Sequence, residues 1–296
     1  MNILQLDQNM FNIILNFLDD KSKLSLLSCC SFLNKMKYDA NYNFIFDDIY
    51  NYAFVKNLPY YFRFKKISYY SKNLTIPDEI THLRFCNEFN EEIKILPKTI
   101  THITFGKWFN QLIKKDILNG VKYIKFGKEF NQNINNCLPD TLEYLIFGDE
   151  FDQPLLNCIS INVKYLVFGK WFNQSINNVI SDTVKYLVFG DYFNQSVDKS
   201  LPKKIKHLTF GRFFNTDITI SLPPTLKYLV LKCSNINNFV NILPNNLEYL
   251  ELSKYFNGNL FNFLPKNIKV LKLNYFCYEQ NKKYIDSNTI ILFHKN

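Results

Sequence analysis

The chain has 296 residues, a formal net charge of +9, and an aromatic share of 17% that comes mostly from Phe and Tyr. No apolar run approaches the ~18 residues that a membrane-spanning helix needs, and the first residues lack the basic start and cleavage site of a secretory signal. We therefore expect a protein of the cytoplasm, or of the nucleus, without a membrane partner.

The first segment, residues 6–38, has the pattern of two helices. Asp7 can cap the first helix, and Asp19-Asp20 ends it before a second helix that runs from about Leu24 to Met36. A head this small cannot bury an all-apolar helix alone, so the first helix should contact something else. Its apolar residues are Met10, Phe11, Ile13, Ile14, Leu15, Phe17 and Leu18.

From residue 76 onward, a strand-like Leu-x-Phe or Leu-x-Leu segment returns ten times. The first step is 20 residues and every later step is 21. Two side chains of each segment should point inward and the middle one outward. A single turn cannot bury two Phe residues alone, whereas stacked turns can, so the period predicts a solenoid. The segments are Leu83–Phe85, Ile103–Phe105, Ile124–Phe126, Leu145–Phe147, Leu166–Phe168, Leu187–Phe189, Leu208–Phe210, Leu229–Leu231, Leu250–Leu252 and Leu271–Leu273.

Other residue types also repeat with this period. A Gly after the strand Phe predicts either a turn with positive φ or a close approach of two backbones, and Asn274 is the substitute best suited to a left-handed turn. An Asn column should hydrogen-bond neighbouring turns. The stretches between strands lack a helical period, which predicts coil or a second short strand on the back. The glycines are Gly106, Gly127, Gly148, Gly169, Gly190 and Gly211.

The repeat reads Leu-Pro-x-x-Ile-x-x-Leu-x-Phe-Gly-x-x-Phe-Asn-Gln-x-Ile, and residues 168–176 are nearly a consensus copy. This pattern resembles the FNIP repeat family, known from social amoebae and giant amoebal viruses. Its Leu-x-x-Leu-x-Leu kernel also looks like a leucine-rich repeat. We therefore expect an α+β fold, in which a small helical head precedes a leucine-rich-repeat-like solenoid with a parallel β-sheet and about ten repeats.

The head resembles an F-box, the motif that docks a receptor onto the Skp-type adaptor of a cullin–RING ubiquitin ligase. An F-box ahead of FNIP repeats is a known arrangement for this family. Asp7, Asn9 and Leu33 depart from the usual Pro, Glu and Trp. The other interpretation is a helix pair that only caps the first solenoid turn. The resemblance implies that the adaptor-binding residues are Leu6, Met10, Ile14, Leu15, Leu18, Leu24, Leu26 and Cys30.

These patterns divide the chain into four segments. They are a head (1–40), a linker and N-terminal cap (41–75), the solenoid (76–273) and a C-terminal cap (274–296). Outward-facing strand residues form an aromatic stripe with a basic edge and an apolar centre, which predicts a partner-binding face. Alternatively, the Tyr rings simply stack to stabilise the sheet, and both interpretations are compatible. The face comprises Tyr123, Tyr144, Tyr165, Tyr186, Tyr228, Lys164, Lys185, Lys206, Ile146, Val167 and Val188.

The sequence indicates no enzyme, no catalytic residue and no cofactor. It has no phosphate loop, nucleophile elbow or zincin motif. His82 and His102 fall on adjacent turns but lack a third metal ligand, so we expect no metal site. No Cys-x-x-Cys pair exists, and Cys137 and Cys158, one repeat apart, are interpreted as reduced core fillers.

The resemblance implies the substrate receptor of an SCF-type ubiquitin ligase, whose head binds the Skp-type adaptor and whose solenoid binds an unknown target protein. The alternatives are a free-standing repeat scaffold, a decoy that sequesters the adaptor, and a solenoid that binds nucleic acid or another polyanion. Glu143, Glu248 and Glu251 interrupt the basic stripe and argue against a nucleic-acid partner.

Overall fold

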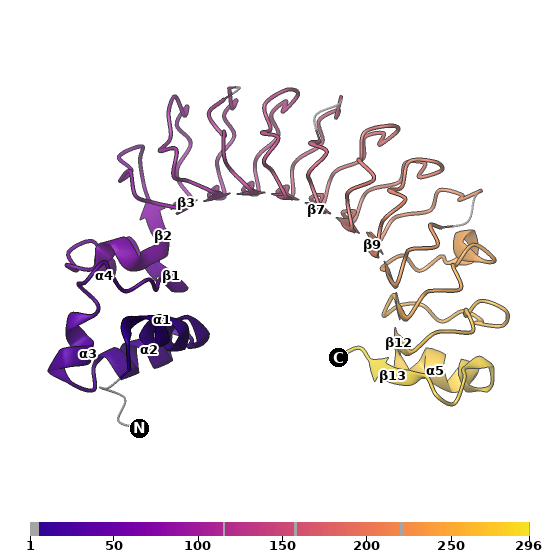
Figure 1. Cartoon of the computed structure of the whole chain (residues 1–296). Coiled ribbons are helices and arrows are strands. Elements are labelled where there is room, and N and C mark those ends of the chain that lie inside the picture. Colours follow the sequence, from indigo (N-terminus) through magenta and orange to yellow (C-terminus); the bar gives the residue numbers. More distant parts are fainter. Residues whose placement is uncertain (1–5, 115, 157–158, 220–221, 296) are drawn as a thin grey trace.

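The computed structural model describes residues 6–114, 116–156, 159–219 and 222–295. Within these residues, thirteen parallel strands form one sheet, and their order in space is their order in the sequence. Figure 1 shows that the sheet bends into an arc, with the strands along the inner side and the connecting loops radiating outward. The predicted α+β architecture, a helical head followed by a parallel solenoid, is confirmed.

Ten of the strands are the repeated segments predicted from the sequence. Each pairs with the next without a shift, so that Leu83 stands opposite Ile103 and Leu166 opposite Leu187. Side chains at equivalent positions therefore stack in columns. The ten are β3 (His82–Phe85), β4 (His102–Thr104), β5 (Tyr123–Lys125), β6 (Tyr144–Ile146), β7 (Tyr165–Val167), β8 (Tyr186–Val188), β9 (His207–Phe210), β10 (Tyr228–Leu231), β11 (Tyr249–Leu252) and β12 (Val270–Leu273).

The sheet continues into both segments that were predicted to be caps. At one end, β1 (Phe46–Asn51) and β2 (Phe64–Ser71) precede the repeats, with α4 (Tyr52–Val55) and the short 3-10 helix η2 (Tyr61–Arg63) between them. At the other end, α5 (Tyr275–Asn281) and η4 (Lys282–Tyr284) lead into β13 (Ile290–Phe293).

The loops between the repeated strands are coil, as predicted. Their described residues contain one 3-10 helix, η3 (Asn237–Phe239), and the alternative of a second short strand is not formed there. Left-handed residues recur in these outer loops, spaced by about one repeat or two. They are Asp116, Asn136, Asn178, Lys199, Asn241 and Asn262. Asn and Asp tolerate this conformation better than other side chains do, which explains most of the set.

Two columns of Phe fill the interior. Ring centroids lie 3.8 to 4.3 Å apart within a turn. Between turns the spacing is 5.3 to 6.2 Å. The rings are at most 4% exposed, so every turn depends on its neighbours for burial. The columns are Phe85, Phe105, Phe126, Phe147, Phe168, Phe189 and Phe210, and Phe89, Phe109, Phe130, Phe151, Phe172, Phe193 and Phe214.

The six repeated glycines are required by close backbone approach, one of the two predicted reasons. A Cβ atom at any of them would lie 1.6 to 1.9 Å from the carbonyl oxygen of the preceding turn. Positive φ occurs instead at Gly120, outside this set. The expectation for Asn274 was therefore wrong. Its φ is −80°, and its side chain caps α5 by accepting from the Cys277 N–H.

The predicted Asn ladder forms. The Oδ1 of each member accepts the backbone N–H of its counterpart one turn later, at 2.7 to 3.0 Å. In five turns the same Oδ1 also accepts from the Gln that follows that counterpart. Only an acceptor oxygen is needed here, so Asp152 serves as well as Asn.

The described part of the head contains three helices rather than the two predicted. They are α1 (Gln8–Phe17), α2 (Asp20–Leu27) and α3 (Ser31–Lys35), and none of the described helices could span a bilayer. Asp7 and Asp19 cap α1 and α2 as side-chain acceptors. The predicted second helix is interrupted because Cys30 is extended, at φ −155° and ψ 165°.

Buried charges fasten the head to the first strands. The Arg63 guanidinium lies 3.9 Å from the Phe44 ring and donates to carbonyls of the 36–44 segment, including Tyr42 O at 2.8 Å. Asp20 accepts from Lys23, from the Asp48 N–H and from the Tyr50 hydroxyl. Burial opposes ionisation of Asp20, but these bonds outweigh it and lower the pKa of its carboxyl. The head and β1 therefore form one packed unit.

Among the cysteines, Cys137 is a half-buried free thiol, while Cys158 lies outside the described residues. Buried thiols in the described chain are Cys86, Cys233 and Cys277.

We predict that Gly148→Ala destabilises the solenoid by about 1–3 kcal/mol or more, because the added methyl would meet the Gly127 carbonyl at 1.7 Å. No side-chain rotation relieves a contact with backbone. Urea unfolding followed by circular dichroism measures the loss. Asp149→Ala, at the exposed next residue, is the control, and equal midpoints for the two variants would contradict the close-packing explanation.

Candidate functional site

The inner face of the sheet carries an aromatic ladder. His82, His102, Tyr123, Tyr144, Tyr165, Tyr186, His207, Tyr228 and Tyr249 occupy equivalent positions on successive strands. Their ring centroids lie 4.1 to 6.1 Å apart. The stacking proposed from the sequence is therefore present, and partial exposure leaves ring edges free for contact: Tyr144 is 42% exposed and Tyr228 38%.

The closest tyrosine pair is Tyr165 and Tyr186, at 4.1 Å and 8° between ring planes. Burial, followed by a hydrogen bond with Tyr186, raises the pKa of the Tyr165 hydroxyl to about 12. The Tyr165 phenol is therefore neutral at physiological pH, and its hydroxyl can donate or accept a hydrogen bond.

Beside the ladder runs the predicted basic edge, and ion pairs neutralise part of it. Glu143 contacts Lys164 at 2.6 Å, while Glu248 contacts Lys227 at 2.7 Å and Lys269 at 2.9 Å. The hydrogen bonds that Lys227 and Lys269 donate to Glu248 lower the pKa of its carboxyl to about 2.

Lys185 and Lys206 are exposed, and neither forms an ion pair within the described part of the chain. Of the three predicted binding lysines, these two are the ones available to a partner.

On the other side of the ladder, Ile146, Val167 and Val188 form a half-buried aliphatic strip, as predicted. Arg84, Thr104 and Lys125 precede this strip on β3, β4 and β5. At the other end of the column, Glu251 pairs with Lys272 at 3.1 Å and lies 3.9 Å from His294. The face is therefore basic at one end, apolar in the middle and charge-balanced at the other end.

His82 and His102 stack at 4.1 Å with 11° between their planes, and each Nδ1 lies 2.8 Å from the hydroxyl of the preceding Thr. Burial lowers the pKa of His82 to about 4, and His102 and Lys66 add to the effect. The described residues contain no group of three His, Cys, Asp or Glu that could hold a metal ion. The pair is a neutral stack at physiological pH.

The head presents a second surface. Helix α1 buries Phe11 and Leu15 but exposes Met10 (45%), Ile13 (58%) and Phe17 (87%) on another side. These three are spaced three and four residues apart, so they share one face. A contiguous exposed apolar patch is typical of an interaction site.

Met10, one of the residues predicted to bind an adaptor, belongs to this face, and Ile14 and Leu18 directly follow its other two members in the sequence. One was assigned wrongly: Leu15 is 0% exposed and holds α1 on the head core, so it cannot touch a partner. Ile13 and Phe17, which the predicted set did not include, are the most exposed residues of this face, and the all-round apolar pattern of the helix was their signal. Met10 is exposed, and the half-buried members are Leu6, Ile14, Leu18, Leu24, Leu26 and Cys30.

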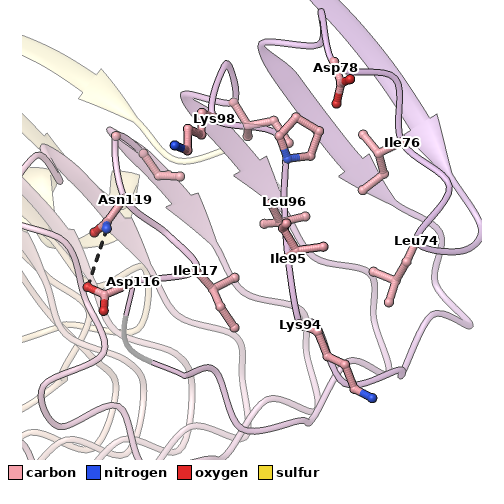
Figure 2. A pocket seen from close by; sticks show the side chains of 14 residues that line it. Leu74, Ile76, Asp78, Lys94, Ile95, Leu96, Lys98, Asp116, Ile117 and Asn119 are labelled. Atoms are coloured by element: carbon pink, nitrogen blue, oxygen red, sulfur yellow. Dashed lines mark hydrogen bonds between the residues drawn. The ribbon is translucent and has the colours of Figure 1, made fainter.

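The outer loops hold a depression of about 860 Å³ between the turns that precede β3, β4 and β5. Figure 2 shows Ile95 and Leu96 on the middle loop, between Ile76 on one side and Ile117 on the other. Ile95 is 82% exposed. Its lining carries two lysines and two aspartates, whose formal charges cancel.

Comparison with known families matches the FNIP repeat over residues 70–108, 109–150, 151–192, 172–200, 193–234 and 239–276. These segments cover more than half of the chain. The chain belongs to the FNIP repeat family. The match includes every repeated strand from β3 to β12.

Two known proteins are similar to part of this FNIP protein. The "Putative F-box protein L165" of Acanthamoeba polyphaga mimivirus is 34% identical over 92 residues, which are 30% of this chain and 31% of the relative. The crystal structure of CroV588, described as a novel circular LRR protein, matches with a TM-score of 0.63 and 34% identity. That match covers 78% of this chain and 36% of the other, so this chain spans about a third of the length of either relative.

We predict different outcomes for the two aromatic columns. Phe168→Ala should cost about 3–5 kcal/mol of unfolding free energy, because the ring is 3% exposed between two neighbouring turns. The double variant Tyr165→Ala/Tyr186→Ala should lower the unfolding free energy by about 1 kcal/mol or less, since both rings are partly solvated. Chemical denaturation compares them. Equal losses would show that the tyrosines are structural.

We predict that acid weakens the fold through His82. Its pKa in the folded chain, about 4, lies below the ordinary 6.5, so the unfolded chain binds the proton more readily. This contribution is complete at neutral pH and is lost as the pH falls from 6.5 towards 4. His82→Phe keeps a stacked ring that does not titrate. Unfolding midpoints across this pH range should fall less steeply for the variant, and parallel curves would refute the assignment.

Proposed function

We propose that this FNIP protein is the substrate receptor of an SCF-type cullin–RING ubiquitin ligase. The head binds the Skp-type adaptor, and the inner face of the solenoid binds a target protein in the cytoplasm or nucleus. The chain itself supplies no catalytic step and needs no cofactor. The similarity to an F-box protein over about a third of the chain supports the adaptor half of this proposal.

The observation that carries the proposal is the exposed apolar face of α1. A helix pair that only capped the solenoid would bury its apolar residues against β1 and present polar ones to solvent. Here Phe11 and Leu15 already complete the packing of the head, yet Ile13 and Phe17 remain exposed beside them. Leaving such residues in water is unfavourable unless a partner covers them.

The inner face of the solenoid supports the second part of the proposal, the binding of a target protein. Its aromatic ladder, free Lys185 and Lys206 and aliphatic strip supply the mixture of aromatic, cationic and apolar contacts found at protein interfaces. The parallel register keeps these side chains in fixed columns, so a partner meets a surface that is already organised.

We predict that the purified chain binds a Skp-type adaptor with micromolar affinity or better, and that Ile13→Ser/Phe17→Ser weakens this binding at least about tenfold, or about 1.4 kcal/mol. Both side chains are exposed, so the melting temperature should stay the same. Ile95→Ser/Phe261→Ser is the matched control, since it removes an exposed Ile and an exposed Phe far from α1. Biolayer interferometry measures the affinities.

Removal of residues 1–40 would be a poorer test, because it would strip buried contacts from β1 and leave Arg63 without hydrogen-bond partners at Met36, Lys37 and Asp39. Failure of the folded chain to bind any Skp-type adaptor would contradict the proposal and favour a free-standing scaffold. Adaptor binding by a chain whose inner face recruits no protein would favour the decoy.

A further inference from the structure

The basic end of the inner face contains a shallow depression of about 320 Å³. Its polar lining comes from Arg84, Asn87, Thr104, Lys125, Lys128 and Asp149. The glycine column contributes to the rest of the lining. The depression lies at the ends of β3, β4, β5 and β6.

Three of these side chains stand in one row. Arg84 pairs with Thr104, and Thr104 pairs with Lys125, on consecutive strands. Neighbouring strands are ~4.8 Å apart, so the two cations flank a hydroxyl over about 10 Å. Long side chains from both ends can converge on an anion above the Thr, and guanidinium, hydroxyl and ammonium groups are all donors to phosphate or carboxylate oxygens.

The charge of this row is not compensated. Arg84 and Lys125 are exposed and make no ion pair within the described residues. Lys128 is partly balanced by Glu129 at 3.8 Å and Glu150 at 4.0 Å. At the opposite end of the same column, by contrast, Glu251 neutralises Lys272. A negative group on a partner would therefore be drawn to one end of the face.

The aliphatic strip continues directly from this row. From Thr104 to Ile146 there are two strand steps, and from Thr104 to Val188 there are four. These distances are about 10 and 19 Å, which an extended peptide at ~3.3 Å per residue covers in about three and six residues. The cationic row and the aliphatic strip are thus separated by a distance that a single extended peptide segment can span.

We propose that the inner face recognises an extended protein segment with an acidic group, followed or preceded by aliphatic residues about three to six positions away. This rests on the proposed function and names the chemistry of its target. The acidic group binds Arg84, Thr104 and Lys125, and the aliphatic residues bind Ile146, Val167 and Val188. A nucleic acid fits less well, because the ladder rings stack on one another and offer no open faces to bases.

The test uses the full chain and fluorescent degenerate peptides, read by anisotropy. Each peptide carries phosphoserine, Glu or Ser, then two or three Gly-Ser spacer residues and three aliphatic residues, and each is made in both orders. The phosphoserine or the Glu peptides should bind at least tenfold tighter than the Ser peptides in one order. Comparing the phosphoserine peptides with the Glu peptides shows whether the recognised charge is a phosphate or a carboxylate. Replacing the aliphatic residues by Ser should abolish the difference.

Arg84→Ala/Lys125→Ala should remove this preference, bringing acidic peptides to within about twofold of Ser peptides. Arg212→Ala/Lys272→Ala, a matched pair whose charges are already balanced by Asp191 and Glu251, should keep it. Three results would overturn the inference: equal binding of Ser peptides, unchanged binding by the first variant, or tighter binding of a single-stranded oligonucleotide. Adaptor affinity, measured on the same samples, reports separately on the head.

Discussion

Backbone contact at the glycine column is the constraint on which the rest of this solenoid depends. The carbonyl of one turn lies where the Cβ of the next would be, so the turns approach as closely as two backbones can. That approach fixes the translation from turn to turn. The two Phe columns can then stack ring on ring, and each Asn oxygen can meet the next N–H. From β3 to β9, the functional columns on the inner face share this register, because they stand on the strands that this contact aligns.

The repeated part of the molecule could be predicted closely from sequence because one packing problem is solved ten times. A residue that recurs every 21 positions must sit in an equivalent environment, which identified the strands, both Phe columns, the Asn ladder and the aromatic stripe. The role of glycine could be narrowed only to two alternatives, since positive φ and close approach select the same residue. The left-handed sites fall instead on residues such as Asn136 and Asn241, whose side chains also suit ordinary loops.

The head was predicted less well, for a reason that its contacts make clear. Its shape depends on single interactions that occur once, such as the five Arg63 hydrogen bonds to carbonyls of the 36–44 segment and the buried Asp20–Lys23 pair. No period reveals them. The distribution of apolar residues around α1 indicated that the helix has two contact faces, but not that Leu15 belongs to the buried one and Phe17 to the exposed one. The same limit applies to Lys164, whose ion pair with Glu143 depends on rotamers.

The buried charges of the head also bear on how a receptor would work. Asp20 and Arg63 join the helices to β1 and the segment before β2, so the head and the first turns are continuous rather than linked by a flexible tether. A partner held on α1 would then keep a fixed direction relative to the arc, and a segment held on the inner face would be presented to it at a fixed distance. The uncompensated cations lie on β3 and β5, at the end nearer the head, which would place the acidic end of a bound segment closest to the adaptor.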